Sequence, residues 1–542
     1  MSASTLPSSD RPAGLATPRN LILPALCVFA LFLAFSVLRV PVPAPNEPHY
    51  LAKAQHYWDK EFCPGDFFLD SANTHRVFYH TVGWATRFLT LAQTAIVGRI
   101  VALLLLAVGW TAFVSRLLPG RWGSLWSAAV FLAISATGNF SGEWIVGGVE
   151  AKVFSYAFVF FGLAFLFERR WIVAGLSTGL AISFHPVVGI WAVAAAVFAG
   201  AVRQFAKRSD LPTLGEPVSR GVAAKQIILA TVALVVASLP GLIPALNVVG
   251  SAAPEVQFQA DYIVVFYRLK HHLNPMDFTW RQYSGYAILW YLWLFVELRR
   301  QSIQRAEAWN RWFVFGAMFI AFAGLVVGLD ERTGKEMPFY AERMKLMKFY
   351  PFRLADVMLP IACSITLVRL ALTARAGEGD VGANQSQRGS RFAWLLCAAC
   401  MIFALTVPSR VLPSRPTAKA IARKDDWKEA CRWISKNAPA DALFLTPHNS
   451  VAFKWYAQRA EYVALKDCPQ DAAGIVEWNR RLLDRADWGR RYFDNGYSAE
   501  ALREFQQTTK VTHMLATRQL NVPLEPIHSN EHFRVYRLGD LP

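Results

Sequence analysis

Several stretches of this 542-residue sequence contain almost no charged residues. Clear examples are 21–38 (LILPALCVFALFLAFSVL), 97–115 (VGRIVALLLLAVGWTAFVS) and 227–246 (IILATVALVVASLPGLIPAL). As helices of about 20 residues, such runs match the roughly 30 Å hydrocarbon core of a bilayer. Apolar residues make up 54% of the chain, above the roughly 45–50% of soluble domains. The shortage of charge within these runs excludes a soluble enzyme and predicts a protein that crosses a membrane several times.

Acidic residues are also scarce. The chain has 39 Asp and Glu against 56 Lys and Arg, a formal net charge of +17. Basic proteins can bind the phosphates of nucleic acids, but these cations stand in short links between apolar runs, as in 168–170 (ERR), 203–208 (RQFAKR) and 298–305 (LRRQSIQR). Cations in such links set the orientation of a membrane protein. The charge therefore predicts topology and argues against nucleic acid as a partner.

Cysteine is too sparse and irregular for a structural metal site. The seven cysteines show no metal-type spacing. Cys397 and Cys400 form a CxxC inside an apolar stretch (LLCAACMIF), where they are expected to be packing residues. Cys431 and Cys468 either form a disulfide in an oxidising compartment or remain free thiols. The sequence also lacks a glycine-rich phosphate-binding loop and an internal repeat.

The apolar runs predict about eleven spans and a cytoplasmic N-terminus. The basic links at 168–170 and 203–208 should lie on one side, which requires a hairpin at His185-Pro186 between two short spans. An odd number of spans places the C-terminus outside, together with the segments 41–93, 139–152, 249–283 and 330–351. The predicted spans lie near 20–40, 95–116, 123–138, 153–167, 171–184, 186–202, 225–248, 284–298, 311–329, 352–371 and 392–408.

The composition changes after Pro408, which divides the chain into a membrane domain, 1–413, and a C-terminal domain, 414–542. The second part is charged and rich in turns, and it has the size of one small domain. Helices are expected from Asp425 or Asp426 onward, around 449–459, and at 472–486 and 498–508; strands are expected at 442–445, 462–465, 511–516 and 533–538. This alternation predicts an extracytoplasmic α/β domain.

The ionisable residues gather in the outer segments and are rare within the spans. A transporter usually needs ionisable groups near the middle of the bilayer, whereas a cluster at one interface is typical of chemistry on a lipid headgroup. The outer segments hold Glu47, His49, Glu143, Glu150, Lys152, Arg268, Lys270, His271, His272, Arg343, Arg353 and Asp356.

Four stretches of sequence resemble the GT-C superfamily of membrane glycosyltransferases. They are the first outer loop (PNEPHYLAKAQHYW), Glu150-Ala-Lys152 in the second, the hairpin (AGLSTGLAISFHPVVGIWAV) and the start of the terminal domain (DDWKEACRWISKNAPADALFL). The superfamily includes protein O-mannosyltransferases, aminoarabinose transferases and oligosaccharyltransferase catalytic subunits. Its first outer loop commonly carries two adjacent carboxylates, and here Asn46-Glu47 stands in that place.

The resemblance implies transfer of a hexosyl or pentosyl group from a polyprenyl-phosphate donor to an acceptor. A carboxylate would remove the acceptor's proton; Glu47 is expected in this role, with Glu150 as a second carboxylate. Arg and Lys, or a bound divalent metal that the sequence does not require, would stabilise the leaving phosphate. The expected phosphate-binding residues are Lys152, Arg268, His271, His272, Arg343 and Arg353.

These residues also have purely structural interpretations. Glu47 could stabilise the N-terminus of a helix, Glu150 and Lys152 could form an interfacial ion pair, and Arg353 and Asp356 could neutralise each other. The sequence therefore leaves alternatives on the same scaffold: a flippase for lipid-linked glycans, or an envelope assembly protein whose terminal domain binds a partner. The expected location is the cytoplasmic (inner) membrane.

Overall fold

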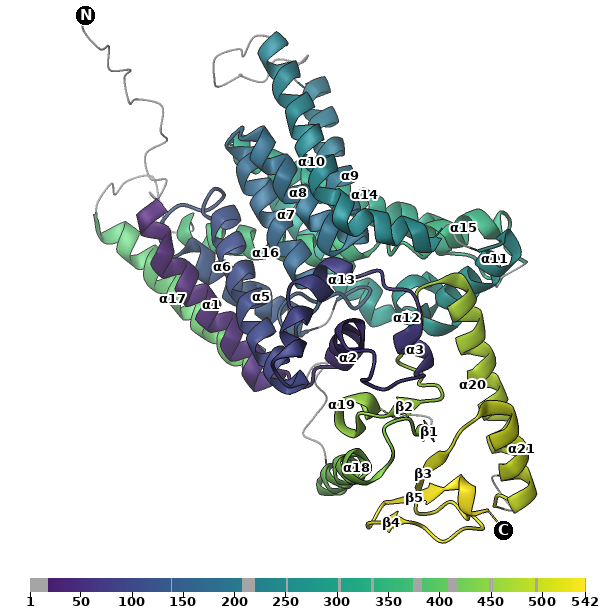
Figure 1. The fold of residues 1–542 in the computed structure, drawn as a ribbon. Coiled ribbons are helices and arrows are strands. Elements are labelled where there is room, and N and C mark those ends of the chain that lie inside the picture. The colour runs from purple at the N-terminus through teal and green to yellow at the C-terminus, as the bar shows by residue number, and fades with distance from the viewer. Residues whose placement is uncertain are drawn as a thin grey trace, which may run out of the picture.

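The computed structural model is mostly helical, with a small sheet near the C-terminus (Figure 1). It describes residues 18–541 except 138, 207–219, 250–251, 301–303, 333–335, 374–382, 408–416, 448–449, 451 and 493–495. The helices up to residue 406 are α1 (Pro18–Arg39), α2 (Glu47–Trp58), α3 (Phe67–Asp70), α4 (Arg76–His80), α5 (Leu91–Val114), α6 (Gly123–Ala136), α7 (Ala151–Phe167), α8 (Trp171–Phe184), α9 (Pro186–Ala206), α10 (Arg220–Val249), α11 (Pro254–Ile263), α12 (Lys270–Leu273), α13 (Trp280–Leu298), α14 (Arg305–Gly328), α15 (Tyr340–Met347), α16 (Arg353–Thr373) and α17 (Ala383–Thr406). Short 3-10 or π-helical turns lie at Gly83–Arg87, Val264–Arg268 and Pro275–Asp277.

A helix lies at each range that was predicted to span the membrane. Among the described residues, six helical segments are long and apolar enough to cross a membrane: Leu21–Arg39, Leu91–Val114, Pro186–Gln204, Ala224–Val249, Arg305–Gly328 and Arg353–Leu372. The helices α6, α7 and α8 and the segment Arg391–Thr406 are apolar but shorter. Multiple membrane helices are therefore supported, and the number eleven stays a prediction.

The predicted hairpin at His185-Pro186 is confirmed as a break between two helices. His185 has φ −148° and ψ 95°, so it is extended where α8 ends. The proline ring disfavours helical backbone in the residue before it, and Pro186 then begins α9, where its missing N–H costs no hydrogen bond. One long helix over 171–202 is thereby ruled out.

Glycines allow α8 to approach α10 closely. A Cβ at Gly175 would overlap the carbonyl oxygen of Ala230, and one at Gly179 would lie 2.8 Å from the Cβ of Ala237. These glycines are four residues apart and so lie on one face of α8. Such small residues are typical of contacts between membrane helices, because they let two backbones pack directly.

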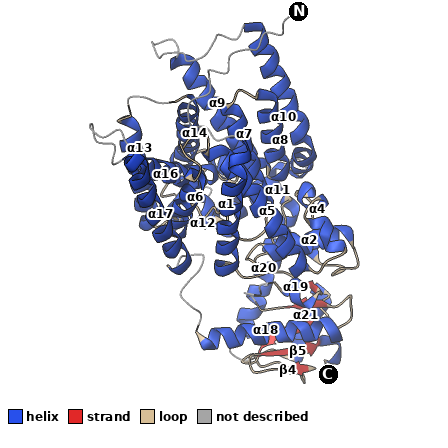
Figure 2. Ribbon diagram, turned by 90° about the vertical axis from the view of Figure 1, so that its left-hand side faces the viewer, coloured by secondary structure: helices blue, strands red, loops and turns tan. Residues whose placement is uncertain are grey.

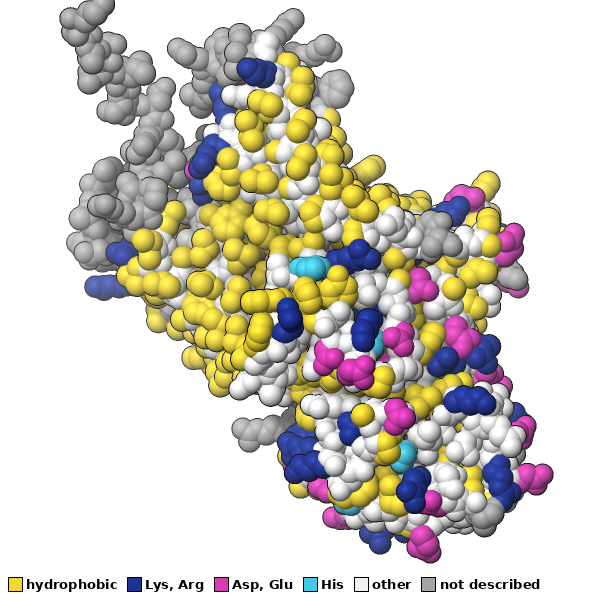
Figure 3. All heavy atoms as spheres, in the orientation of Figure 1, with side chains coloured by type: hydrophobic (Ala, Val, Ile, Leu, Met, Phe, Trp, Pro, Cys, Tyr) yellow, Lys and Arg dark blue, Asp and Glu magenta, His cyan; other side chains and the backbone are white. Residues whose placement is uncertain are grey.

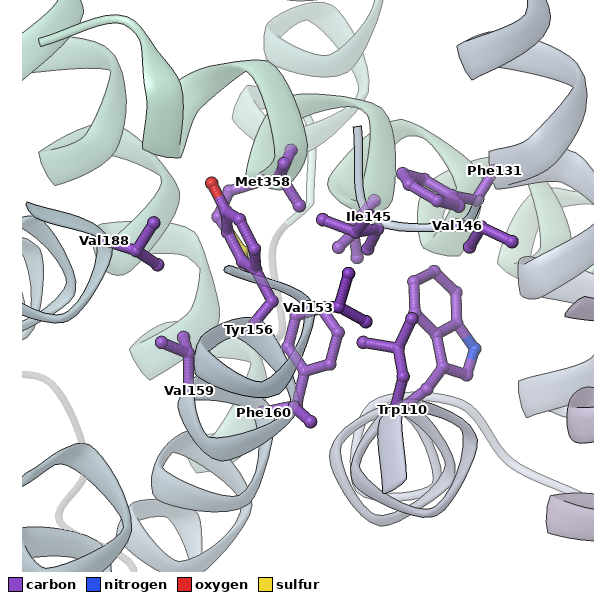
Figure 4. Close-up of a cluster of buried hydrophobic side chains, with 14 of the residues drawn as sticks. Trp110, Phe131, Ile145, Val146, Val153, Tyr156, Val159, Phe160, Val188 and Met358 are labelled. Atoms are coloured by element: carbon purple, nitrogen blue, oxygen red, sulfur yellow. The ribbon is translucent and has the colours of Figure 1, made fainter. Parts of the chain in front are cut away.

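Aromatic side chains fill the space between α5, α6 and α7 (Figure 4). The ring centroid of Trp110 lies 5.1 Å from that of Phe131 and 5.8 Å from that of Phe160. The outer surface of the long helices is apolar as well, whereas charged side chains gather over the terminal part (Figure 3). Exposed residues such as Val37, Ile228 and Leu246 would form an unusually large apolar surface in water and suit contact with lipid.

The terminal part contains a five-stranded sheet of order β2-β1-β3-β5-β4 (Figure 2). β1 pairs in parallel with β2 and β3, and β5 pairs antiparallel with β3 and β4. The elements are α18 (Ala418–Asn437), β1 (Leu443–Leu445), α19 (Phe453–Ala457), β2 (Ala460–Glu461), α20 (Ala472–Tyr492), α21 (Ala499–Thr509), β3 (His513–Thr517), β4 (His528–Ser529), β5 (Phe533–Arg537) and a 3-10 turn at Leu538–Asp540.

Three local predictions for this part were wrong or incomplete. The strand predicted at 462–465 lies two residues earlier, and β4 was not predicted. The first helix begins at Ala418, because the Thr417 side chain accepts a hydrogen bond from Ala420 N and caps it there, not at Asp425 or Asp426. Cys431 and Cys468 are free thiols. The sequence left open whether they form a disulfide, and in the structure they do not.

Candidate functional site

Glu47 holds the start of α2 against α5. Its side chain is fully buried, and its two oxygens accept hydrogen bonds from Arg99 Nε (2.6 Å) and Nη2 (2.8 Å). The backbone N–H groups of Ala44 (2.7 Å) and Val149 (2.9 Å) also donate to it. The carboxylate is therefore fully engaged with protein groups, an arrangement that favours a positioning role for Glu47.

Asn46, beside Glu47, reaches the second outer loop. It makes no cap hydrogen bond with its side chain, and its Nδ2 instead donates to Oε1 of Glu150 (2.7 Å). Asn46 thus orients a carboxylate that a distant part of the chain supplies.

Lys152 joins the two buried carboxylates of the second outer loop. Its Nζ lies 3.5 Å from Oε2 of Glu143 and 3.4 Å from Oε2 of Glu150, and it stands 4.1 Å above the ring of Trp144. Burial raises the pKa of Glu150, and the charge of Lys152 and the hydrogen bond from Asn46 offset this only in part. A carboxylate with a raised pKa is a stronger base than a solvated one.

Asp356 shapes the loop that carries Glu143. Its oxygens accept hydrogen bonds from Phe140 N (2.8 Å), Ser141 N (2.7 Å) and Ser141 Oγ (2.6 Å). The ion pair expected between Arg353 and Asp356 is not formed within the described residues. Arg353 Nε instead lies 3.3 Å from Oε2 of Glu143, because the backbone and hydroxyl of the loop already occupy Asp356.

Arg353 also contacts aromatic and imidazole side chains. Its Nη1 donates to His185 Nε2 (2.9 Å) at the hairpin, and its guanidinium lies 4.0 Å from the ring centroid of Tyr350. The ring of His185 is 6.0 Å from that of His75. Burial, with nearby positive charge, lowers the pKa of His75 to about 3, so this histidine is neutral at physiological pH.

The third outer segment supplies Arg268, His271 and His272. His272 Nδ1 is hydrogen-bonded to the carbonyl of Ser141, and burial lowers the pKa of His272 to about 3. Its ring is 4.0 Å from that of His271. Arg268 Nη2 donates to the backbone oxygen of Lys466 (3.0 Å) in the terminal domain, and within the described residues Arg268 has no carboxylate partner.

Buried ion pairs join the terminal domain to the first outer loop. Lys454 Nζ lies 2.8 Å from Asp467, 3.1 Å from Glu461 and 3.4 Å from Asp66. Burial alone would lower the pKa of Lys454, but these three carboxylates together raise it well above its usual range. Asp467 also contacts His49 Nδ1 at 3.2 Å.

Six charged residues thus come together between the long helices and the terminal sheet: Glu143, Glu150, Lys152, Arg268, Arg353 and Lys466. We refer to them as the charged cluster. The four cations and two carboxylates leave a formal charge of +2. Asp467, next to Lys466 in the chain, contacts Lys454 and His49 and also acts on Lys466 through its charge. An excess of positive charge in a partly buried site favours an anionic ligand.

Four of the six members, Glu150, Lys152, Arg268 and Arg353, are residues that the sequence predicted for the site. Glu143 and Lys466 were not predicted as site residues. Glu143 is one of several ionisable residues in the predicted outer segments. Its contact with Arg353, which marks it as a member of the cluster, is visible only in the structure. Lys466 belongs to a charged pair, Lys466-Asp467, directly after an apolar run, and that pattern is a weak signal. Arg343 is not brought to the cluster, because its Nη1 pairs with Asp330 (2.9 Å) beside α15.

The cluster does not fit a divalent metal in this arrangement. Glu143 and Glu150 are each paired with Lys152 or Arg353. Of the nearby histidines, His185 uses its Nε2 to bind Arg353 and His272 uses its Nδ1 to bind the carbonyl of Ser141. Within the described residues, one group of three potential ligands lies close enough to hold an ion: Asp426, Glu531 and His532 in the terminal domain. No step is therefore assigned to a metal at the charged cluster.

Comparisons with known proteins give a match to part of the chain and similarity to solved structures over most of it. A family model described as "Domain of unknown function (DUF6798)" matches residues 425–485, a segment that contains Lys454, Lys466 and Asp467. No curated protein matches the chain. A solved structure of ArnT from Cupriavidus metallidurans, bound to undecaprenyl phosphate, is similar with 12% identity and a TM-score of 0.42, over 96% of this chain and 98% of that one.

Proposed function

We propose that the protein is a GT-C-type glycosyltransferase of the cytoplasmic membrane that moves a sugar from a polyprenyl-phosphate donor to an acceptor at the outer face. The charged cluster is the observation that carries this proposal. It combines a carboxylate of raised pKa with an excess of cations, at a place where the outer loops meet the apolar helices. A lipid phosphate could reach this place while its chain stays in the bilayer.

The reaction needs a proton acceptor and a counter-charge. The acceptor's oxygen attacks the anomeric carbon of the sugar, and its proton passes to a carboxylate. The bond between that carbon and the phosphate oxygen breaks, and the electron pair stays on the oxygen. The phosphate thereby changes from a singly charged diester to a monoester with a charge near −2. Cations that meet this growing charge stabilise the transition state more than the bound donor.

Glu150 is the base in this proposal. It is buried, Asn46 orients it, and Lys152 lies beside it, so the carboxylate is held in a fixed position from which it can accept a proton. Glu47, the other carboxylate expected to be catalytic, acts as a positioning residue that fixes Asn46 and the second outer loop. Lys152, Arg268 and Arg353 bind the phosphate, with His271 and His272 at its edge.

The test is mass spectrometry of lipids that copurify with the full-length protein. We expect a polyprenyl phosphate with the wild type and a severalfold lower amount with Arg268→Ala. Arg343→Ala is the matched control, since it removes an outer arginine that pairs with Asp330 away from the cluster. Absence of polyprenyl phosphate from the wild type, or equal loss in both variants, would contradict the proposal.

A further inference from the structure

The terminal domain contacts the first outer loop through a short segment around β2. Asp66 Oδ2 accepts a hydrogen bond from the backbone N–H of Glu461 (2.9 Å), and Lys454 lies between Asp66, Glu461 and Asp467. Asp66 and Lys454 are buried. Because separating these groups would leave buried charges without partners, the contact is expected to be tight.

Lys466 extends from this segment toward the outer loops. The residue is partly buried and lines a cleft between the two domains that also contains Pro45 and Pro48. Burial, and then the charge of Arg268, lower the pKa of Lys466; Glu150 and Lys152 are also close enough to affect it. Arg268 Nη2 lies 3.0 Å from the backbone oxygen of Lys466, so a cationic side chain of one domain contacts a cationic residue of the other.

Neither Arg268 nor Lys466 has a carboxylate partner within the described residues. The one hydrogen bond found for the Arg268 side chain goes to a backbone oxygen, and its Nε is buried without a partner. A charge that is taken out of water is costly unless a group of opposite charge pairs with it. The Arg268 and Lys466 side chains are therefore suited to share one anionic group.

We propose that Lys466 of the terminal domain binds, together with Arg268 of the third outer segment, the phosphate that leaves the sugar. This inference rests on the proposed function. It makes the site a composite of two domains, complete only while Lys454 holds the segment around β2 against Asp66. The family model that matches 425–485 then covers a segment that takes part in lipid binding.

The inference can be tested by binding of farnesyl phosphate and farnesol to the full-length protein in detergent. Both probes carry the same isoprenoid chain, and they differ in the phosphate. Lys466→Met keeps much of the apolar stem and removes the charge. We expect it to weaken farnesyl phosphate binding about tenfold, as for loss of one charge-assisted hydrogen bond, and to leave farnesol binding unchanged. Lys466→Arg should restore most of the affinity.

Lys436→Met is the matched control, because Lys436 is exposed on α18 of the same domain. Equal farnesyl phosphate affinity for Lys466→Met and the wild type would overturn the role of Lys466 and leave the proposed function standing. Equal weakening for both probes would assign Lys466 a structural role. Failure of the wild type to prefer farnesyl phosphate over farnesol would overturn the proposed function itself. Displacement by inorganic phosphate at equal concentration would assign the site to free phosphate.

Discussion

Glu150 combines burial, a neighbouring cation and an orienting amide, which are the features expected of a base. We expect Glu150→Gln to lower the turnover number about 10²–10⁴-fold, the usual contribution of general base catalysis. Donor binding should change little, because the amide keeps the size of the side chain and can still accept from Asn46. Transfer of labelled sugar and retention of polyprenyl phosphate would be measured on the same preparation. Normal turnover would remove Glu150 from the mechanism.

The raised pKa of Glu150 also predicts how activity depends on pH. The carboxylate is the working form, so kcat/KM should increase with pH through the raised pKa and then level off. The effect on folding has the opposite sign, because the folded state holds this proton more tightly than the unfolded chain. The contribution of Glu150 to stability is thus greatest at low pH and declines as pH rises between the unfolded and the folded pKa. Thermal unfolding of Glu150→Gln should lack this decline.

If Glu47 serves to pair with Arg99, its substitution should change the stability of the protein, whereas a purely catalytic Glu47 could be replaced without loss of stability. Glu47→Gln leaves Arg99 buried without its counter-charge and should destabilise the protein by about 3–5 kcal/mol. The double variant Glu47→Met with Arg99→Met should recover much of this loss, because neither charge remains. Thermal unfolding in detergent would measure both. A Glu47→Gln variant that is as stable as the wild type but inactive would support the role of base predicted from the sequence.

The partners of individual side chains could not be predicted from the sequence, because many of them lie far away in the chain. Glu47 and Arg99 are 52 positions apart, and Arg268 and Lys466 are 198 apart. Composition and spacing predicted that Glu150, Lys152, Arg268 and Arg353 lie on one side of the membrane. They could not show which carboxylate is neutralised by a neighbour, since that depends on how α5 and the second outer loop pack.

At the scale of elements, the long helices were predictable because an apolar run of span length has few alternatives to a helix. The hairpin was predictable from Pro186 and the flanking charges. The short strands were not: β2 and β4 have two residues each, too few for an alternating pattern. Their place is set by pairing with β1 and β5, and the sequence does not encode that pairing locally.

The contact between α8 and α10 gives a prediction at the same scale. Gly175→Ala adds a methyl group that would overlap the backbone of Ala230, so α8 and α10 must move apart and the melting temperature should fall. Gly221→Ala is the matched control, because a Cβ at Gly221 has nothing within 4 Å and alanine favours a helix by about 0.5–1 kcal/mol. Equal melting temperatures for the two variants would show that the close approach contributes little.

For the whole molecule, the positions of the basic links predict that the terminal domain lies outside and the link after α9 inside. In a variant without native cysteines, Asn437→Cys on α18 should react with an impermeant maleimide in whole cells. Ser209→Cys should react only after the membrane is broken. Asn437 is exposed, so its protection in intact cells would contradict the predicted orientation. Labelling of Ser209→Cys from outside would show that α8 and α9 cross the membrane in the direction opposite to the predicted one.

The formal charge of +2 in the charged cluster has a consequence for the order of events in a catalytic cycle. A cluster with more cations than carboxylates should hold a doubly charged, spent lipid carrier more tightly than the singly charged donor that enters. Departure of that carrier, and not the transfer of sugar, would then limit the rate. Such an enzyme slows as its own by-product accumulates, and its output depends on how quickly the surrounding membrane removes and recharges the carrier.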